Sequence, residues 1–162
     1  MDVSKYRHEG SIAIDRSPHD VYALVSDVTR IGELSPVCAS SAWTDPARVG
    51  NEGAWFTGHN VIGDLSWDTQ CEVVAAQPGR EFAWINHGPA GDVALVRWGY
   101  RFQPAGTGTT VTESWQILPA YPDFVGGRDP NMDVAKRMDG MADLARTGID
   151  QTLANLKRIA EA

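Results

Sequence analysis

The chain has 162 residues, a formal net charge of −7 at pH 7 and a sequence pI near 4.9. It contains no run of Lys or Arg, so we expect no nucleic-acid partner and no binding to anionic membranes through basic residues. No apolar run approaches the roughly 20 residues of a membrane span, which excludes stable membrane insertion through a helix.

Length and cysteine content limit the fold and the compartment. A chain of this size most simply forms one domain and buries roughly two-thirds of its unfolded surface. Cys38 and Cys71 are too far apart for a CxxC motif, and the first ten residues have no apolar signal-peptide segment. We therefore expect a reduced, cytoplasmic protein, present as a monomer or a homodimer.

The first elements follow from alternation and capping residues. Residues His8–Arg16 alternate between apolar and polar positions, which predicts a half-buried strand. Ser17 can cap a helix, and Pro18 then occupies the first helical position, where its fixed φ is favourable. A second short helix is predicted over Arg30–Leu34.

Residues 38–118 have the two-residue period of strands. Turn residues divide this region into six predicted strands, of which Leu65–Ala75 and Val96–Phe102 have the clearest polar and apolar faces. Residues Thr110–Leu118 alternate equally well and place Glu113 on the apolar side. All of these strands are expected to be antiparallel, because each has one wet and one dry face.

The strand near residues 54–62 has two possible registers. The inner side of the sheet is occupied in one register by Phe56, Gly58 and Asn60. In the other register it is occupied by Trp55, Thr57 and His59. Only one set can face inward, so the alternation leaves open whether Asn60 or His59 does so. An inward Asn60 could orient a ligand carbonyl or hydroxyl, or simply satisfy nearby backbone.

The C-terminal third is predicted to be a loop and a long helix. Residues Pro119–Arg128 contain Tyr121, Phe124 and two glycines, which indicates a flap able to close over a site. Asp129 and Pro130 have the pattern of a cap and a first helical turn. From Asp133 to Glu161 apolar residues recur at helical spacing, which predicts an amphipathic helix of roughly 40 Å.

Six tryptophans lie in the strand region, between Trp43 and Trp115. Four of them, Trp67, Trp84, Trp98 and Trp115, are in phase with the apolar side of their strands. So much aromatic surface facing one helix either fills a bulky core or lines a cavity. Indoles need a partner for their N–H and often line ligand walls, which is compatible with a cavity, and both interpretations stay open at this point.

Several segments carry a resemblance to a known family. They are 11–27 (SIAIDRSPHDVYALVSD), 56–60 (FTGHN), 67–73 (WDTQCEV), 78–84 (PGREFAW) and 108–115 (GTTVTESW). These segments resemble the polyketide cyclase/dehydrase and lipid-transport family of the START-like SRPBCC superfamily, over about residues 8–160. The resemblance implies one START-like domain spanning 1–162.

The implied architecture is the α+β helix-grip fold. In it a curved, antiparallel, seven-stranded sheet wraps around a long C-terminal helix, with two short helices after the first strand. Family resemblance further implies an apolar pocket between sheet and helix. Members of the superfamily bind lipids, sterols, plant hormones or polyketides, some cyclise aromatic polyketides, and others act as co-chaperones.

We accordingly expect a protein that binds or transports a hydrophobic small molecule. There are two alternatives. One is a polyketide cyclase or dehydratase in which Glu113, with Tyr100 or Asn60, acts as acid or base, and the other is a co-chaperone-like interaction module. The residues expected to contact the ligand are Phe56, Asn60, Trp67, Thr69, Trp84, Trp98, Tyr100, Glu113, Trp115, Tyr121, Phe124, Met138 and Met141.

Glu113 is the chief polar residue expected inside this pocket. An ionised carboxylate there must be paired or hydrogen-bonded, or its pKa rises. It can pair with a nearby Arg or His, reach water at the pocket opening, contact a ligand, or transfer protons.

Other chemistry has little support in the sequence. The four histidines lie on different predicted elements without metal-ligand spacing, so we expect no metal site. Cys71 is most simply a small buried hydrophobe, and no GxSxG elbow or phosphate loop is present. No cofactor is expected.

Overall fold

A curved sheet wrapped around one long helix forms the molecule. The computed structural model describes residues 1–162, and its seven antiparallel strands are ordered β1-β7-β6-β5-β4-β3-β2. The strands are β1 (Arg7–Ile14), β2 (Cys38–Trp43), β3 (Trp55–Ile62), β4 (Leu65–Gln77), β5 (Glu81–Asn86), β6 (Val96–Ala105) and β7 (Gly108–Ile117). This is the helix-grip fold, as predicted.

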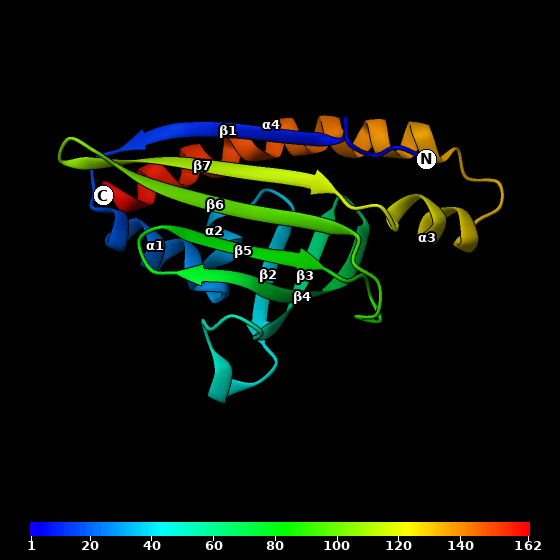
Figure 1. Ribbon diagram of the computed structural model, residues 1–162, viewed down its shortest axis with the longest axis horizontal. Coiled ribbons are helices and arrows are strands. Elements are labelled where there is room, and N and C mark those ends of the chain that lie inside the picture. The colour runs from blue at the N-terminus through cyan, green and yellow to red at the C-terminus, as the bar shows by residue number, and fades with distance from the viewer.

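The helices connect and cover this sheet. They are α1 (Pro18–Ser26), the 3₁₀ turn η1 (Val28–Arg30), α2 (Ile31–Leu34), the 3₁₀ turn η2 (Pro46–Arg48), α3 (Tyr121–Arg128) and α4 (Val134–Ala160). Figure 1 shows α4 running along β1 and β7, with α3 at the far end of the molecule from the C-terminus. No helix is long and apolar enough to cross a membrane.

Local capping explains where the two main helices begin. The Ser17 side chain accepts a hydrogen bond from the Asp20 backbone N–H at 3.2 Å, and Pro18 follows at the first helical position. The Asp133 carboxylate likewise accepts from the Lys136 N–H at 3.0 Å, which starts α4 at Val134. The start of α1 agrees with the sequence prediction, whereas the cap of α4 is Asp133 and not the expected Asp129.

A close approach at β1 fixes the position of α4. A Cβ atom added at Gly10 would lie 2.8 Å from Ile149 Cγ2, nearer than real side chains tolerate. Glycine therefore lets α4 pack directly onto β1. The helix packs mainly against β1, β7, α1 and α2, whereas the middle strands of the curved sheet stand further from it. Space consequently remains between the middle strands and α4.

The register of β3 decides which side chains enter this space. Phe56 pairs with Cys71 of β4, and Asn60 pairs with Trp67, so Asn60 shares the inner face with Phe56. His59 points to the outer face, where its Nδ1 lies 2.7 Å from Asp68 Oδ1. The ambiguity of this strand is thereby resolved in favour of Asn60.

The segment predicted as a flexible flap is instead mostly helix α3. Pro122 in its first turn presets φ, and the buried Tyr121 and Val125 anchor the helix against the core. This packing outweighs the cost of two glycines, each worth roughly 1 kcal/mol relative to alanine within a helix. Intrinsic propensity therefore misled the prediction at this point.

Candidate functional site

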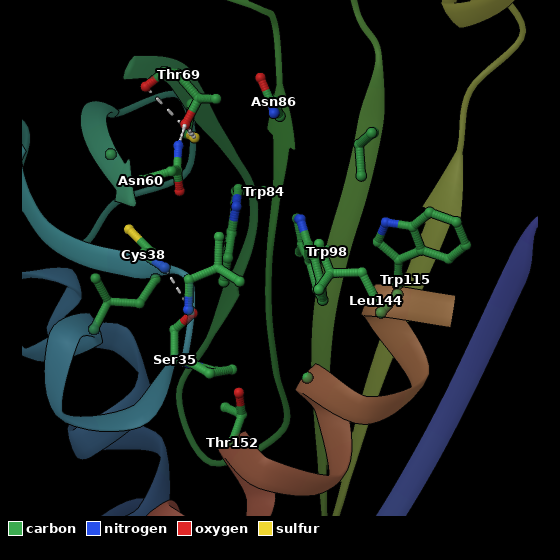
Figure 2. A pocket seen from close by; sticks show the side chains of 18 of the residues that line it. Ser35, Cys38, Asn60, Thr69, Trp84, Asn86, Trp98, Trp115, Leu144 and Thr152 are labelled. Carbon is green, nitrogen blue, oxygen red and sulfur yellow. Dashed lines mark hydrogen bonds between the residues drawn. The ribbon is translucent and has the colours of Figure 1, made fainter. Parts of the chain in front are cut away.

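A cavity of about 200 Å³ lies between the inner face of the sheet and α4. Its lining comprises 23 residues, 14 of them hydrophobic, so a ligand inside would meet mainly apolar surface. Side chains from strands β3 to β7 form one side, and α4 with the α2–β2 connection forms the other (Figure 2). The exposed Pro36 and Leu144 mark its mouth, one from each of these two segments.

Most residues predicted to contact a ligand line this cavity. They are Phe56, Asn60, Trp67, Thr69, Trp84, Trp98, Tyr100, Glu113, Trp115 and Met141. Figure 2 shows Trp84, Trp98 and Trp115 projecting from three different strands toward the same space. The even spacing of inward positions along antiparallel strands brings them together.

The other two tryptophans lie elsewhere. Trp55 is on the outer face, with its ring 4.8 Å from that of His87. Trp43 packs edge-on against Phe56 with ring centroids 5.6 Å apart, behind the cavity lining. Four indoles therefore belong to the cavity and two do not.

Three predicted contact residues do not line the cavity. Met138 is fully buried in the core, one helical turn before Met141. The Tyr121 hydroxyl accepts from Arg137 Nε at 3.1 Å and donates to the sulfur of Met141, while Phe124 lies under the Arg128 guanidinium. The predicted aromatic lid is wrong for this conformation, because α3 packs at the end of α4 rather than over the mouth.

The connection from α2 to β2 was not predicted to line the cavity. Ser35, Pro36, Val37 and Cys38 all line it, and the Ser35 hydroxyl accepts hydrogen bonds from the Val37 and Cys38 N–H groups. The one sequence signal for this connection is Ser35-Pro36, which ends the preceding helix. The chain runs from α2, which packs against α4, to β2 at the sheet edge opposite β1, and it therefore crosses the open side of the sheet.

Nine further residues complete the lining of the cavity. These are Ile31, Gly58, Cys71, Asn86, Val96, Leu144, Ala145, Gly148 and Thr152. Burial raises the pKa of the Cys71 thiol to about 12, so it stays protonated and acts as a small apolar group. Asn60 donates its amide to the Trp67 carbonyl at 3.3 Å and to Thr69 Oγ1 at 3.4 Å.

Glu113 is the one carboxyl group in the lining. It is 3% exposed, and its Oε1 accepts a hydrogen bond of 2.9 Å from the Tyr100 hydroxyl, across the β6–β7 pair. Its Oε2 is buried and has no hydrogen-bond partner. The partner is thus a tyrosine rather than the Arg or His that the sequence led us to consider.

The environment of Glu113 favours its neutral form. Burial raises the pKa of this carboxyl from 4.5 to about 8, and the hydrogen bond from Tyr100 offsets part of the rise. Burial also raises the pKa of Tyr100 well above its ordinary value, so the phenol remains a donor. At neutral pH the pair therefore presents one protonated carboxyl to the cavity.

The comparisons with known proteins agree with this geometry. A family model described as polyketide cyclase/dehydrase and lipid transport matches residues 6–161. The chain belongs to this family. A polyketide-cyclase-like protein from Corynebacterium glutamicum, Cgl2372, is 38% identical, with a TM-score of 0.69 over 96% of this chain and 91% of that one. No protein of curated function matches the sequence.

More distant solved structures share the fold. The di-domain ARO/CYC protein StfQ of the steffimycin biosynthetic pathway is 14% identical, with a TM-score of 0.71 over 96% of this chain and 50% of that one. Ara h 8.0201 is 14% identical, with a TM-score of 0.63 over 95% of this chain and 96% of that one. At such identities the likeness shows that these proteins share a fold with this chain, and it says nothing of which ligand this chain binds.

Proposed function

We propose that the protein binds or transports a hydrophobic small molecule, such as a lipid, a polyketide or an aromatic compound, in the cavity between sheet and α4. The observation that carries this proposal is the cavity itself, which a packed core would have filled. Its lining of indoles and aliphatic side chains with a few polar groups is typical of small-molecule sites.

Cavity volume limits the size of the ligand. The volume of about 200 Å³ exceeds the roughly 150 Å³ that holds benzene in an engineered protein cavity, and lies below the roughly 300 Å³ at which drug-sized pockets begin. A compound of one or two rings therefore fits this conformation. A longer chain would require the α2–β2 connection to move away from α4.

A pair of helix variants tests the proposal. A Cβ atom added at Gly148 would lie 4.0 Å from Pro36 Cγ at the mouth, whereas one at Gly140 meets nothing within 4 Å. We expect Gly148→Leu to abolish retention of aromatic compounds in native mass spectrometry and their quenching of tryptophan fluorescence. Gly140→Leu is the matched control. Equal binding by both variants would place the ligand outside the cavity.

A second candidate is a polyketide cyclase or dehydratase that uses Glu113. One observation favours it: a carboxyl with a pKa near 8, bonded to Tyr100, has the properties of a general acid at neutral pH. Its test is turnover of a polyketide substrate by Glu113→Gln, which keeps the shape of the side chain. Turnover at the wild-type rate would exclude Glu113 as the proton donor.

A further inference from the structure

No positively charged side chain lines the cavity. Glu113 is its one carboxyl, and no Lys, Arg or His is among the lining residues. The other titratable side chains of the lining, Cys38, Cys71 and Tyr100, all have raised pKa values because burial disfavours their charged forms, so they remain neutral. An anionic ligand would find no positive partner here, and burying it would cost free energy.

One oxygen of Glu113 is buried without a hydrogen-bond partner. Oε1 accepts from Tyr100, and Oε2 is buried with no partner although Glu113 lines the cavity. In the neutral form Oε2 can carry the proton; once the carboxyl ionises, Oε2 needs a donor, so a ligand that supplies one stabilises the ionised form. A charged donor gains most, since hydrogen bonds between ions are the strong ones.

The rest of the lining also suits a cation. Asn60 uses its amide nitrogen to bond Trp67 and Thr69, which leaves Oδ1 free to accept a hydrogen bond. Indole and phenol rings attract cations through their faces, and Trp84, Trp98, Trp115 and Tyr100 all contribute rings. The net charge of −7 raises the local concentration of cations around the protein.

We propose that the cavity binds a small amine of one or two rings, whose ammonium group pairs with Oε2 of Glu113, and that it rejects carboxylates of the same size. This inference rests on the proposed binding function and names the class of ligand. The ring system occupies the aromatic part of the cavity, and the nitrogen lies beside Glu113.

Binding of an ammonium ion must release a proton. The carboxyl is mostly protonated at pH 7 and has to ionise to form the ion pair, so its proton leaves to solvent. As the pH increases toward 8, affinity for the amine therefore rises about tenfold for each pH unit. Above pH 8 the carboxyl is already ionised and the affinity levels off. A neutral alcohol or ketone accepts from the protonated carboxyl, so its affinity falls above pH 8.

Few other groups near Glu113 complicate this titration. Tyr100 faces it from β6 and stays neutral, and Gly10 is its neighbour on β1. From α4, Ala145 and Thr152 line the same cavity, and neither titrates. Asp150 of α4 approaches Gly10, but it is exposed to solvent.

Three probes of one shape test the inference. Phenethylamine, 2-phenylethanol and phenylacetate each carry a polar atom three bonds from a phenyl ring, and they differ in charge. Isothermal titration calorimetry at pH 6, 7 and 8, in buffers of low and high ionisation enthalpy, measures affinity and proton release together. We expect tenfold tighter amine binding at pH 7 than at pH 6, release of nearly one proton at pH 6, and no binding of the carboxylate.

The Glu113→Gln variant separates the two proposals. It should weaken amine binding at pH 8 at least tenfold, abolish its pH dependence, and leave the alcohol unaffected. If the alcohol binds and the amine binds no more tightly, or if the variant keeps amine affinity, the amine inference is overturned while the binding function stands. If none of the three probes binds, the inference and the proposed function fail together.

Discussion

The buried carboxyl of Glu113 makes the stability of the fold depend on pH. Its pKa rises from 4.5 in the unfolded chain to about 8 in the folded protein, so the folded state holds a proton that the unfolded state has already lost. The stability that this group contributes is fully present below pH 4.5 and is lost as pH rises through 8. Glu113→Gln removes the titration and keeps a side chain that can accept from Tyr100.

The size of the effect follows from the two pKa values. One pKa unit corresponds to about 1.4 kcal/mol, and the group is half ionised at pH 8, so between pH 5.5 and pH 8 the wild type loses about 3 kcal/mol relative to the variant. Urea unfolding followed by tryptophan fluorescence at half-unit steps of pH measures this difference directly. Subtracting the two curves cancels every other group that titrates in both proteins.

A matched control is Glu9→Gln, an exposed carboxylate of β1 that pairs with Arg101 at 3.2 Å. We expect it to leave the difference curve nearly flat, because surface ion pairs contribute little to stability. Parallel unfolding curves for the wild type and Glu113→Gln would show that Glu113 is ionised or solvated in the folded state, and would refute the reasoning.

Three further predictions concern the same elements. Tyr100→Phe removes the bond that lowers the pKa of Glu113, so the midpoint of the stability change should move above pH 8; a midpoint at or below 8 would contradict that bond. Gly10→Ala should lower the free energy of unfolding in urea by about 1–3 kcal/mol, because the added Cβ atom would clash with Ile149. In the control Gly127→Ala the added Cβ atom contacts no other atom within 4 Å, so no such loss is expected. Gly148→Ala should stabilise α4 by about 0.5–1 kcal/mol, and a loss of stability would mean that the mouth is tighter than described.

The individual helices and strands were predictable because their signals are local, and the resemblance to a known family implied their arrangement. Alternation sets the inner face of each strand, and Ser17 and Asp133 cap the two helices that the sequence predicted. Alternation assigns a residue to the inner or outer face of the sheet even when the exact register is unknown. Most residues that line the cavity were therefore predictable. The enzyme alternative placed Tyr100 or Asn60 with Glu113, and the choice of Tyr100 depends on which residues of β6 and β7 lie opposite each other, which alternation does not give.

The errors lie where long-range packing decides. Tyr121 and Phe124 had the composition of a mobile flap, but the contacts of Tyr121 with Arg137 and Met141 hold α3 against α4. Cavity residues from the α2–β2 connection were missed because no periodic pattern marks a loop that crosses the open side of a sheet. The single domain, the cytoplasmic location and the monomer or homodimer state stay predictions.

The central claim is that a hydrophobic molecule occupies the space between the sheet and α4. A crystal structure of the protein grown with 2-phenylethanol or phenethylamine tests it most directly. We predict density for the ring between Trp84, Trp98 and Trp115, with the polar group beside Glu113. Density confined to the outer face of the sheet, or an empty cavity at saturating concentrations of both compounds, would contradict the account.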